Sequence, residues 1–501
     1  MRKDITSVRG TIDFLKREKA ILEVTKEVDP IYEIAGILKA FEGTPPVLFE
    51  NIKGYPGVRN IGNLLANTEV MAKIFNVDNP RKLKFKCLQG FRNPIPPEMA
   101  ENAPCQEVVN VETIDAPAIL PLIKYSERDA GHIDGGGITF LSGKYFRNGT
   151  DISFHRKYFR GKDWASVMTV PGTHLWRVVG EEFREEEVPL TINYNPSPAV
   201  QLVAGCVKGH AVVPPNIDEL GIAGGIQGSP IEIVKAKTVD AYAIANSEWV
   251  IEGTINGGKW VWETEEGEKL DQSGVLPFFP EWDGYLGRVR KAFRLKVTAI
   301  THRKDRPIFH TPLARSFEGY MGSPLREALM YEWAERVWPG FVIDVNMPPA
   351  MSPWAAGIIF QVRKEKASKE GLQKNLLLGA LAQPWCPTLV IVVDEDIDIY
   401  SSDDILFALT TRFNVATDVV RSGSGAITSI AFLHTESGAE IYQPEAVGID
   451  ATVPFKRKPD FERASYPSPR IDLKKWFSQV QIDEMSKWQC EYAKVLARTG
   501  W

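Results

Sequence analysis

The chain has 501 residues, of which 44% are hydrophobic and 25% charged, and its formal net charge is -5. This balance is typical of a globular protein, and the length favours more than one domain. Lys and Arg are scattered among Asp and Glu, so no basic face for nucleic acid or anionic lipid is expected. Small molecules are the expected ligands.

The cysteines and the apolar runs bear on the compartment. Five cysteines stand at wide spacings without a Cys-x-x-Cys pair, which favours neither a disulfide framework nor a zinc ribbon. The opening MRKDITSVRGTIDFL lacks the apolar core of a signal peptide, and the longest apolar run, around 388–393, is too short to cross a bilayer. We therefore expect a cytoplasmic protein that does not enter the membrane.

The first part of the chain, residues 1–112, mixes helix and strand. After Asp29-Pro30 and before Gly43, apolar side chains recur at helical spacing, namely Ile31, Ile34, Ala35, Leu38 and Phe41. This pattern predicts a helix that stops at the glycine. The region is expected to be α/β.

Residues 113–304 are richer in β-type sequence. Runs such as ITFLSGKYF, DISFHRKYF and WASVMTV are separated by turn residues at 148–149 and 161–163. They predict an antiparallel sheet or barrel. The three glycines at 135–137 lack the spacing of a dinucleotide-binding motif and indicate a tight backbone turn.

A second α/β domain is expected over 305–464. SPLREALMYEWAERVWPG has a capping Ser323 and Gly340 beyond its end, and TLVIVVDEDIDIYSSDDILFALTTRF predicts a buried strand followed by a helix. The acidic run 394–398 can hold a divalent ion or stabilise the start of that helix, and we favour the structural role.

The last segment, 465–501, begins with a linker rich in Ser and Pro. Helical spacing then runs through Ile482, Met485, Trp488, Tyr492 and Val495. This terminal helix docks either on its own domain or on a sister subunit, and the sequence leaves both open.

Titratable residues gather in the β-rich region. Asp151, His174 and Glu219 are the ligand types that a divalent ion takes, with room for a phosphate oxygen. Widely spaced Asp, His and Glu also occur by chance in a chain of this length, so the residues alone give only a weak prediction of a metal site.

Several runs resemble the UbiD family of prenyl-FMN-dependent decarboxylases, in the family's order and over nearly the whole chain. They are FENIKGYPG, APCQEVV, DISFHR, VPGTH, DELGIAGGIQGSPIEIVKAKT, SEWVIEGTI, PEWDGY and VVDEDIDIYSSDDILFALTTRFN. The resemblance implies a multi-domain α/β protein whose central split β-barrel binds the flavin. It also implies that the protein is a carboxy-lyase.

The resemblance assigns residues to the flavin site. It places a divalent ion, most often manganese, on Asp151, His174 and Glu219, where it grips the flavin phosphate beside a potassium ion. It assigns the catalytic arginine to Arg156 and the proton-transferring glutamate to Glu281. The full set of cofactor-binding positions that it implies is Asp151, Ser153, Phe154, His155, Arg156, Thr173, His174 and Glu219.

The chain departs from the family pattern at three positions. Asp151 stands where many members have asparagine, Ala446 where a lysine approaches the phosphate, and Leu276 where a second glutamate precedes the proton donor. The family's Glu-Arg-Glu trio is therefore expected to be reduced to Arg156 and Glu281.

The substrate expected from these departures is an aromatic or heteroaromatic acid. The loss at Leu276 resembles members that act on hydroxybenzoates. A weakly polar pocket is expected from Leu276, Asn346, Met347 and Trp354, although ordinary core packing explains Met347 and Trp354 as well.

The strand that carries Asp151 and Arg156 must be interrupted. The two residues are an odd number apart, so a regular strand would point them to opposite faces. A bulge or bend is therefore predicted between them, and His155 is interpreted as a hydrogen-bonded barrel histidine.

The resemblance implies reversible decarboxylation through a covalent prenyl-FMN adduct, with Arg156 positioning the acid and Glu281 protonating the ring carbon. Two alternatives stay open: a carboxylase subunit for a phosphorylated or CoA-linked aromatic, and a non-catalytic flavin-binding subunit. A flavin prenyltransferase is the expected cofactor supplier, and a homodimer or homohexamer is the expected assembly.

Overall fold

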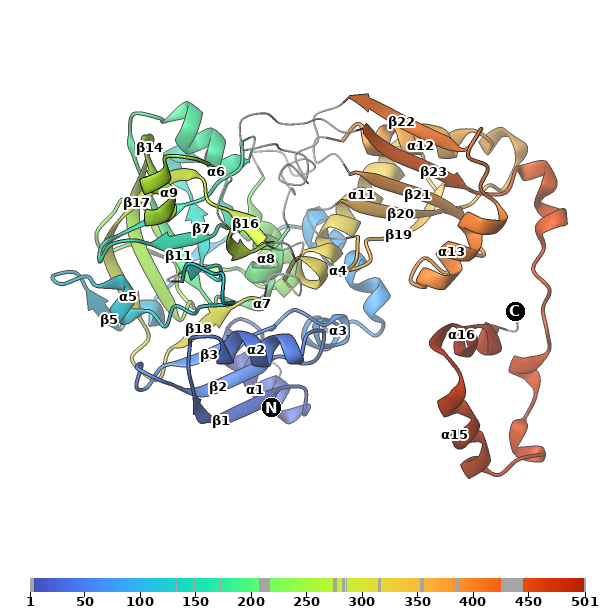
Figure 1. Cartoon of the computed structure of the whole chain (residues 1–501), viewed down its shortest axis with the longest axis horizontal. Coiled ribbons are helices and arrows are strands. Elements are labelled where there is room, and N and C mark those ends of the chain that lie inside the picture. The colour runs from blue at the N-terminus through green and yellow to red at the C-terminus, as the bar shows by residue number, and fades with distance from the viewer. Residues whose placement is uncertain are drawn as a thin grey trace. The chain divides into compact units, whose positions relative to one another are not determined.

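The computed structural model (Figure 1) describes residues 4–131, 133–146, 149–171, 173–206, 217–273, 277–281, 284, 286–313, 317–351, 356–383, 387–424 and 445–499. Its contacts divide the chain into two compact units, one formed mainly by residues up to Trp333 and the other mainly by residues from Ala334 onward. Among the described residues, no helix is both long and apolar enough to cross a membrane.

The N-terminal part of the first unit is a four-stranded sheet with helices α1 (Val8–Arg17) and α2 (Glu33–Ala40). The strand order is β1 (Leu22–Val28), β2 (Val47–Ile52), β3 (Arg59–Gly62) and β18 (Ile308–Thr311). The predicted helix before Gly43 is α2, which buries Ile34, Ala35 and Leu38.

A nine-stranded sheet forms the centre of the first unit. Its strand order is β6-β9-β10-β17-β14-β11-β7-β8, with β5 paired to β17, and all of its pairs are antiparallel. The strands are β5 (Val108–Asn110), β6 (Ile133–Asp134), β7 (Ile138–Leu141), β8 (Asp151–Phe154), β9 (Lys157–Phe159), β10 (Trp164–Val167), β11 (Glu187–Tyr194), β14 (Trp249–Trp262) and β17 (Lys291–His302). The expected split-barrel architecture is confirmed, because this sheet curls into a half-barrel (Figure 1).

The predicted interruption lies between β8 and β9. β8 pairs with β7 and ends at Phe154, whereas β9 begins at Lys157 and pairs with β6 and β10. The two carbonyl groups in the gap still have donors, because Lys157 Nζ donates to His155 O at 2.6 Å and Met168 N to Arg156 O at 3.1 Å. The chain therefore changes direction between Asp151 and Arg156 without leaving these groups unsatisfied.

The glycine run is a tight turn, as predicted. The N–H groups of Gly136 and Gly137 both donate to Asp134 Oδ1, at 2.8 and 3.0 Å. A Cβ on Gly136 would lie 2.2 Å from the carbonyl oxygen of His310. Only glycine lets the two backbones approach this closely.

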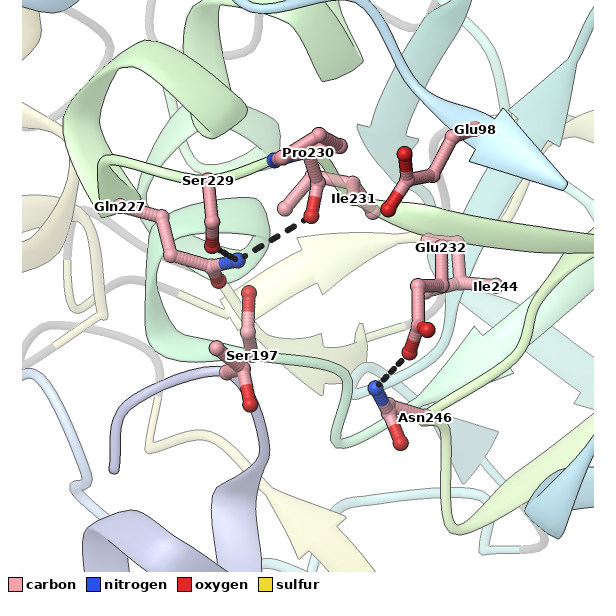
Figure 2. Close-up of a pocket in the computed structure, with 10 residues that line it drawn as sticks. Glu98, Ser197, Gln227, Ser229, Pro230, Ile231, Glu232, Ile244 and Asn246 are labelled. Atoms are coloured by element: carbon pink, nitrogen blue, oxygen red, sulfur yellow. Dashed lines mark hydrogen bonds between the residues drawn. The ribbon is translucent and has the colours of Figure 1, made fainter. Parts of the chain in front are cut away.

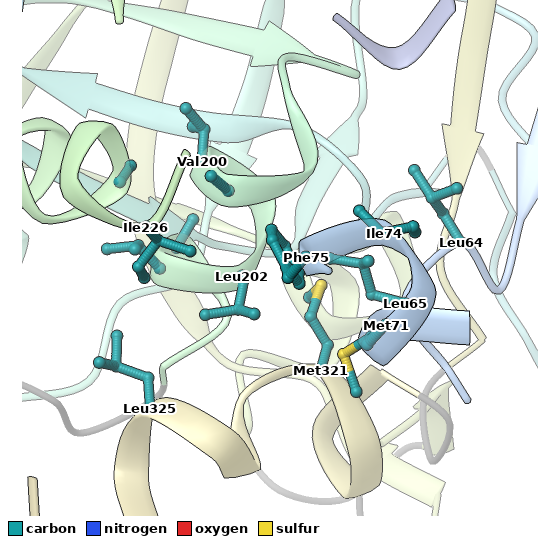
Figure 3. Close-up of a cluster of buried hydrophobic side chains, with 14 of the residues drawn as sticks. Leu64, Leu65, Met71, Ile74, Phe75, Val200, Leu202, Ile226, Met321 and Leu325 are labelled. Atoms are coloured by element: carbon teal, nitrogen blue, oxygen red, sulfur yellow. The ribbon is translucent and has the colours of Figure 1, made fainter. Parts of the chain in front are cut away.

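Helices support the β8 end of the sheet. α7 (Pro198–Ala204) and α8 (Glu219–Gln227) pack on each other and on β8. Their apolar side chains join those of α3 (Thr68–Phe75), α4 (Leu83–Arg92) and α11 (Ser323–Val337) in one buried cluster (Figure 3). Labelled members of this cluster include Phe75, Leu202, Ile226, Met321 and Leu325. This core fixes the start of α8 beside β8.

Two small sheets complete the first unit. One is three-stranded, with order β13 (Tyr242–Ile244), β12 (Glu232–Lys235) and β4 (Glu98–Met99). The other pairs β15 (Pro277–Pro280) with β16 (Leu286–Arg288).

The second unit contains a five-stranded sheet. Its order is β19 (Val342–Asn346), β20 (Gly357–Val362), β21 (Leu389–Asp394), β23 (Glu445–Ala451) and β22 (Val419–Ser424). The predicted strand and helix are β21 and α13 (Ser402–Thr411), and the predicted helix at 323–337 is α11. Helix α12 (Leu372–Leu381) packs on β21 and β23.

The acidic run after β21 has a structural role. Arg412 donates to Asp394 Oδ2 at 3.2 Å and to Asp396 Oδ1 at 2.8 Å. The Asp398 N–H donates to Asp404 Oδ2 at 2.6 Å, while Ser401 rather than the acidic run caps α13. These carboxylates tie the strand end to the helix.

The terminal segment forms two helices, not the single one predicted. α15 (Gln479–Trp488) ends before α16 (Glu491–Thr499) begins. α15 starts with a capping box between Ser478 and Gln481 and buries no residue. Ser468 Oγ donates to Ala497 O at 3.0 Å, so α16 folds back on the linker.

Candidate active site

Three predicted ligands come together beside β8. Asp151 opens β8, His174 opens the short helix α6 (His174–Trp176), and Glu219 is the first residue of α8. His174 Nδ1 lies 2.9 Å from Asp151 Oδ1 and 3.7 Å from Glu219 Oε1. One ligand atom from each residue lies within 4.8 Å of the others, so a single ion can contact all three.

Backbone hydrogen bonds hold Glu219 against β8. The Glu219 N–H donates to Thr150 O at 3.1 Å, and Glu219 Oε2 accepts from Ile152 N at 2.8 Å. Leu220 N also donates to Thr150 Oγ1 at 2.9 Å. These bonds leave Glu219 Oε1 directed toward His174.

The electrostatics of this cluster fit a cation. Burial, and then the charge of Asp151, raise the pKa of Glu219 well above its usual range. Asp151 Oδ2 is buried and has no hydrogen-bond partner among the described residues. Two buried carboxylates with an orphaned oxygen are costly unless a positive group joins them. A hard divalent ion supplies that charge to a carboxylate and imidazole set.

A second cluster is centred on Arg156, in the gap between β8 and β9. Its Nε and Nη2 donate to Glu263 Oε1 and Oε2 at 2.8 and 2.9 Å, and its Nη1 donates to Glu281 Oε1. Burial lowers the pKa of the Arg156 guanidinium, but the charges of Glu263 and Glu281 outweigh this effect and raise it. Arg156 therefore stays charged between two carboxylates.

Glu281 follows β15 and is buried. Phe279 of the same strand is also buried and packs edge-to-face on Tyr125, with ring centroids 5.3 Å apart. A Cβ at Gly287 of β16 would lie 2.4 Å from Glu281 Oε1, so a larger residue there would displace the carboxylate from its present position. The Glu281 carboxylate is thus buried and in contact with Arg156.

Arg156 has a second carboxylate partner that the sequence interpretation did not name, Glu263, so the expected pair of Arg156 and Glu281 has a third charged member in contact with it. Glu263 directly follows β14, is 1% exposed, and also accepts from Arg290 N at 2.9 Å. Glu263 was not predicted from the sequence, because it begins an acidic run that continues into α9 (Glu265–Leu270). Acidic residues at the start of a helix usually stabilise the helix terminus. The position of Glu263 at the end of a long strand was the feature of the sequence that could have indicated its role.

The remaining predicted cofactor-binding positions lie on the same elements. His155 is held by Ser153 Oγ at 2.9 Å and Met168 O at 3.0 Å, and burial lowers the pKa of its imidazole to about 4. Phe154 lies near His310, with ring centroids 6.1 Å apart, and Thr173 caps the turn of His174. His155 is thus a neutral, hydrogen-bonded ring, as its interpretation as a barrel histidine requires.

Two of the four predicted substrate-pocket residues are described by the structure, and two are not. Leu276 and Trp354 lie outside the described residues. Asn346 is buried, and its Nδ2 donates a hydrogen bond to Ile399 O at 2.6 Å. Met347 is also buried, and its backbone N–H donates to Glu327 Oε1 at 2.8 Å. Ala446 is buried in β23, where its N–H donates to Ser422 Oγ at 2.9 Å.

Three domain families match consecutive parts of the chain. They are the N-terminal domain of 3-octaprenyl-4-hydroxybenzoate carboxy-lyase over residues 12–85, its Rift-related domain over 98–316 and its C-terminal domain over 319–451. Together they cover most of the sequence, in the order expected for the whole enzyme.

Individual relatives agree with this match. Gallate decarboxylase from Lactiplantibacillus plantarum is 30% identical over 491 residues, covering 92% of this chain and 96% of the relative. The apo structure of 3,4-dihydroxybenzoic acid decarboxylase (AroY) from Klebsiella pneumoniae is 28% identical, with a TM-score of 0.81 and coverage of 95% of this chain and 100% of AroY.

A further solved structure contains the cofactor. An evolved dimeric form of the UbiD-class enzyme HmfF from Pelotomaculum thermopropionicum, in complex with prFMN, is 28% identical with a TM-score of 0.78. It covers 94% of this chain and 100% of that protein.

Proposed function

The chain belongs to the UbiD family of prenyl-FMN-dependent carboxy-lyases, and we propose that it removes CO2 reversibly from an aromatic or heteroaromatic acid with Glu281 as the proton donor. The observation that carries this proposal is the buried contact between Arg156 and Glu281. Arg156 follows Asp151, a member of the metal-type cluster, by five residues, which supports one composite site.

We propose that Asp151, His174 and Glu219 hold a divalent ion, manganese for preference, and that a potassium ion lies nearby. This ion would bind the flavin phosphate, and its charge would matter more in a chain that has Ala446 at the position of the family's lysine. The phosphate end and the reacting end can belong to one cofactor, because Asp151 and Arg156 are five residues apart and their Cα atoms are separated by at most about 18 Å.

The cofactor supplies the electron sink that lets the carboxylate leave as CO2. The protein residues do the rest. Arg156 can bind a substrate carboxylate through the side of its guanidinium that contacts Glu281 in this structure, because a charged, planar donor group matches a carboxylate. Glu281 gives up that contact when the substrate takes it. Glu263 holds that guanidinium in a fixed orientation from the opposite side.

Glu281 then delivers a proton to the ring carbon from which CO2 has left. A carboxyl on a side chain as buried as that of Glu281 is shielded from bulk water, which favours transfer to carbon over exchange with solvent. Thereafter Arg156 stabilises the carboxylate form of Glu281 until a proton from water restores the acid, so that each carboxylate that loses CO2 consumes one proton from solvent.

The substrate class is proposed from the relatives and the sequence departures. The curated relative is named for gallate and a structural neighbour for 3,4-dihydroxybenzoic acid, both aromatic acids. The test is CO2 release from a panel of benzoic, heteroaromatic and acrylic acids by protein prepared with and without a flavin prenyltransferase. We expect that CO2 is released from the aromatic and heteroaromatic acids but not from the acrylic acids. We also expect that only protein prepared with the flavin prenyltransferase releases it. Release from acrylic acids alone would overturn the substrate class.

We also propose that the chain forms a homo-oligomer through residues 465–501. α15 exposes Val480, Met485 and Trp488, which are 71%, 64% and 81% exposed in the single chain. Such an apolar helix face is typical of a surface that is covered by another copy. The existence of a dimeric form of HmfF supports this assembly.

A further inference from the structure

A cavity of about 240 Å³ lies in the first unit, apart from the residues assigned to CO2 chemistry. The three-stranded sheet β13-β12-β4 forms one wall, and residues at the start of α7 and the end of α8 form another (Figure 2). Its polar lining includes Glu98, Glu232, Ser197 and Gln227, and its apolar lining includes Ile231 and Ile244.

Two carboxylates stand side by side in this cavity. Glu98 of β4 pairs with Glu232 of β12 in parallel register, so their side chains emerge from adjacent strands on the same face of the sheet. Like charges in directly opposed positions destabilise a sheet. Among the described residues that line the cavity there is no Lys or Arg to offset them.

Two further oxygens in the cavity lack partners. Ser197 is 2% exposed, yet its Oγ has no hydrogen bond within the described structure, and it does not cap α7. Gln227 Oε1 is also buried and unpaired, while its Nε2 donates to Ser229 Oγ at 3.0 Å. Buried polar atoms of this kind normally have a partner, and a glutamine oxygen can only accept. The partner that suits this set is therefore a hydrogen-bond donor.

Among the residues that the structure describes, an amide donates to one of these carboxylates. Asn246 Nδ2 donates to Glu232 Oε2 at 2.9 Å, and Asn246 Oδ1 in turn accepts from Arg303 at 3.4 Å. The bond from Asn246 orients the Glu232 carboxylate (Figure 2), and Arg303 in turn holds Asn246. The Asn246 amide adds no positive charge inside the cavity.

We propose that the cavity is a second ligand site, which takes a small organic cation with a primary ammonium group and a short alkyl chain. An ammonium offers three donors for the two carboxylates and the unpaired oxygens. Ile231 and Ile244 can contact the alkyl part. The cavity has about eight times the roughly 30 Å³ that a water occupies in the liquid, which suits a small molecule better than one bare ion.

Ligand-observed NMR on the full chain at fixed ionic strength tests this proposal, with n-butylammonium chloride as the probe. We expect saturable binding of n-butylammonium, no binding of the neutral 1-butanol, and affinity at least tenfold weaker in Glu232→Gln. Glu98→Gln, at an exposed position, should weaken binding similarly and serves if Glu232→Gln does not fold. Glu112→Gln, an exposed glutamate outside the cavity, should bind as the wild type does.

The contrary results are equally specific. Binding of n-butylammonium that is unchanged in both cavity variants would overturn the site. A second contrary result is that the protein does not bind n-butylammonium but binds Mn²⁺ or K⁺ saturably, and that both variants lose this metal binding. That result would overturn the assignment of an organic ammonium as the ligand. Neither outcome depends on decarboxylase activity.

Discussion

Arg156 holds the carboxylate of Glu263 through two hydrogen bonds, 2.8 Å from Nε to Oε1 and 2.9 Å from Nη2 to Oε2. The remaining face of the guanidinium contacts Glu281. A paired, planar contact of this type fixes the plane of the arginine as well as its position. Glu263 therefore fixes the orientation of the Arg156 guanidinium, the group to which we assign substrate binding.

Replacing Glu263 by Gln should impair turnover through Arg156. Removing one partner of a buried ion pair costs about 3–5 kcal/mol of stability, and a misplacement near 1 Å can cost about 100-fold in rate. We expect a lowered melting temperature and a kcat reduced by about 100-fold, with the flavin still bound. Steady-state kinetics and the flavin absorbance of the purified variant provide the measurement.

The matched control is Glu268→Gln, because Glu268 pairs with Arg160 but is itself 61% exposed in its side chain. An exposed pair of this kind contributes about 0–1 kcal/mol, so this variant should behave as the wild type does. Wild-type kcat and stability in Glu263→Gln would refute its positioning role.

The metal cluster predicts a distinct loss. His174→Ala removes the only imidazole of the three clustered ligands, so the purified holoenzyme should contain little divalent metal and little flavin. Asp151→Asn keeps an oxygen ligand and removes one negative charge, and it should retain both. Metal content by mass spectrometry and the visible spectrum measure these outcomes. Stoichiometric metal in His174→Ala would rule out the assignment.

His155 predicts a dependence of stability on pH. Burial, followed by the nearby charge of Lys157, lowers the pKa of its imidazole from 6.5 to about 4. The unfolded chain therefore binds the proton first as the pH falls. The folded state loses stability progressively from pH 6.5 to 4, by roughly 3 kcal/mol in total at this site.

In His155→Gln this contribution should vanish, while the amide can replace part of the contact with Ser153. Urea unfolding at several pH values between 7 and 4 should show a shallower decline for the variant than for the wild type. Parallel declines would mean that His155 is not held neutral by the fold.

The terminal segment predicts the assembly state. Deleting residues 465–501 removes the exposed apolar face of α15 together with Trp476, and the shortened protein should be monomeric in light scattering. The double variant Val480→Glu/Trp488→Glu tests the same surface in the full chain. An unchanged oligomer mass in both proteins would place the interface elsewhere.

Much of the fold could be predicted because local patterns and tertiary structure agree. The helix at 402–411 carries its own cap at Ser401, and the strand that precedes it is a continuous apolar run. The helix at 323–337 also forms as predicted, but Ser323 is its first residue and donates to Gly319 O at 3.2 Å rather than capping it. The interruption before Arg156 followed from the alternation of side chains along a strand. These features depend on residues close together in the chain.

Features set by distant contacts were missed. Glu263 meets Arg156 across 107 residues, and its own neighbourhood indicates only a helix start. Neither Gly nor Pro marks the break between α15 and α16, where Gln489 turns to extended backbone and α16 packs back on the linker. Such tertiary contacts are not encoded in periodicity.

The proton-donor role of Glu281 is tested most directly by hydrogen exchange on the product. Holoenzyme in D2O with a decarboxylated aromatic product should introduce deuterium at the ring carbon that would carry the carboxylate. We predict that Glu281→Gln retains the flavin spectrum and loses at least 100-fold of this exchange rate, as expected when a general acid is removed. Exchange at the wild-type rate in Glu281→Gln would contradict the account.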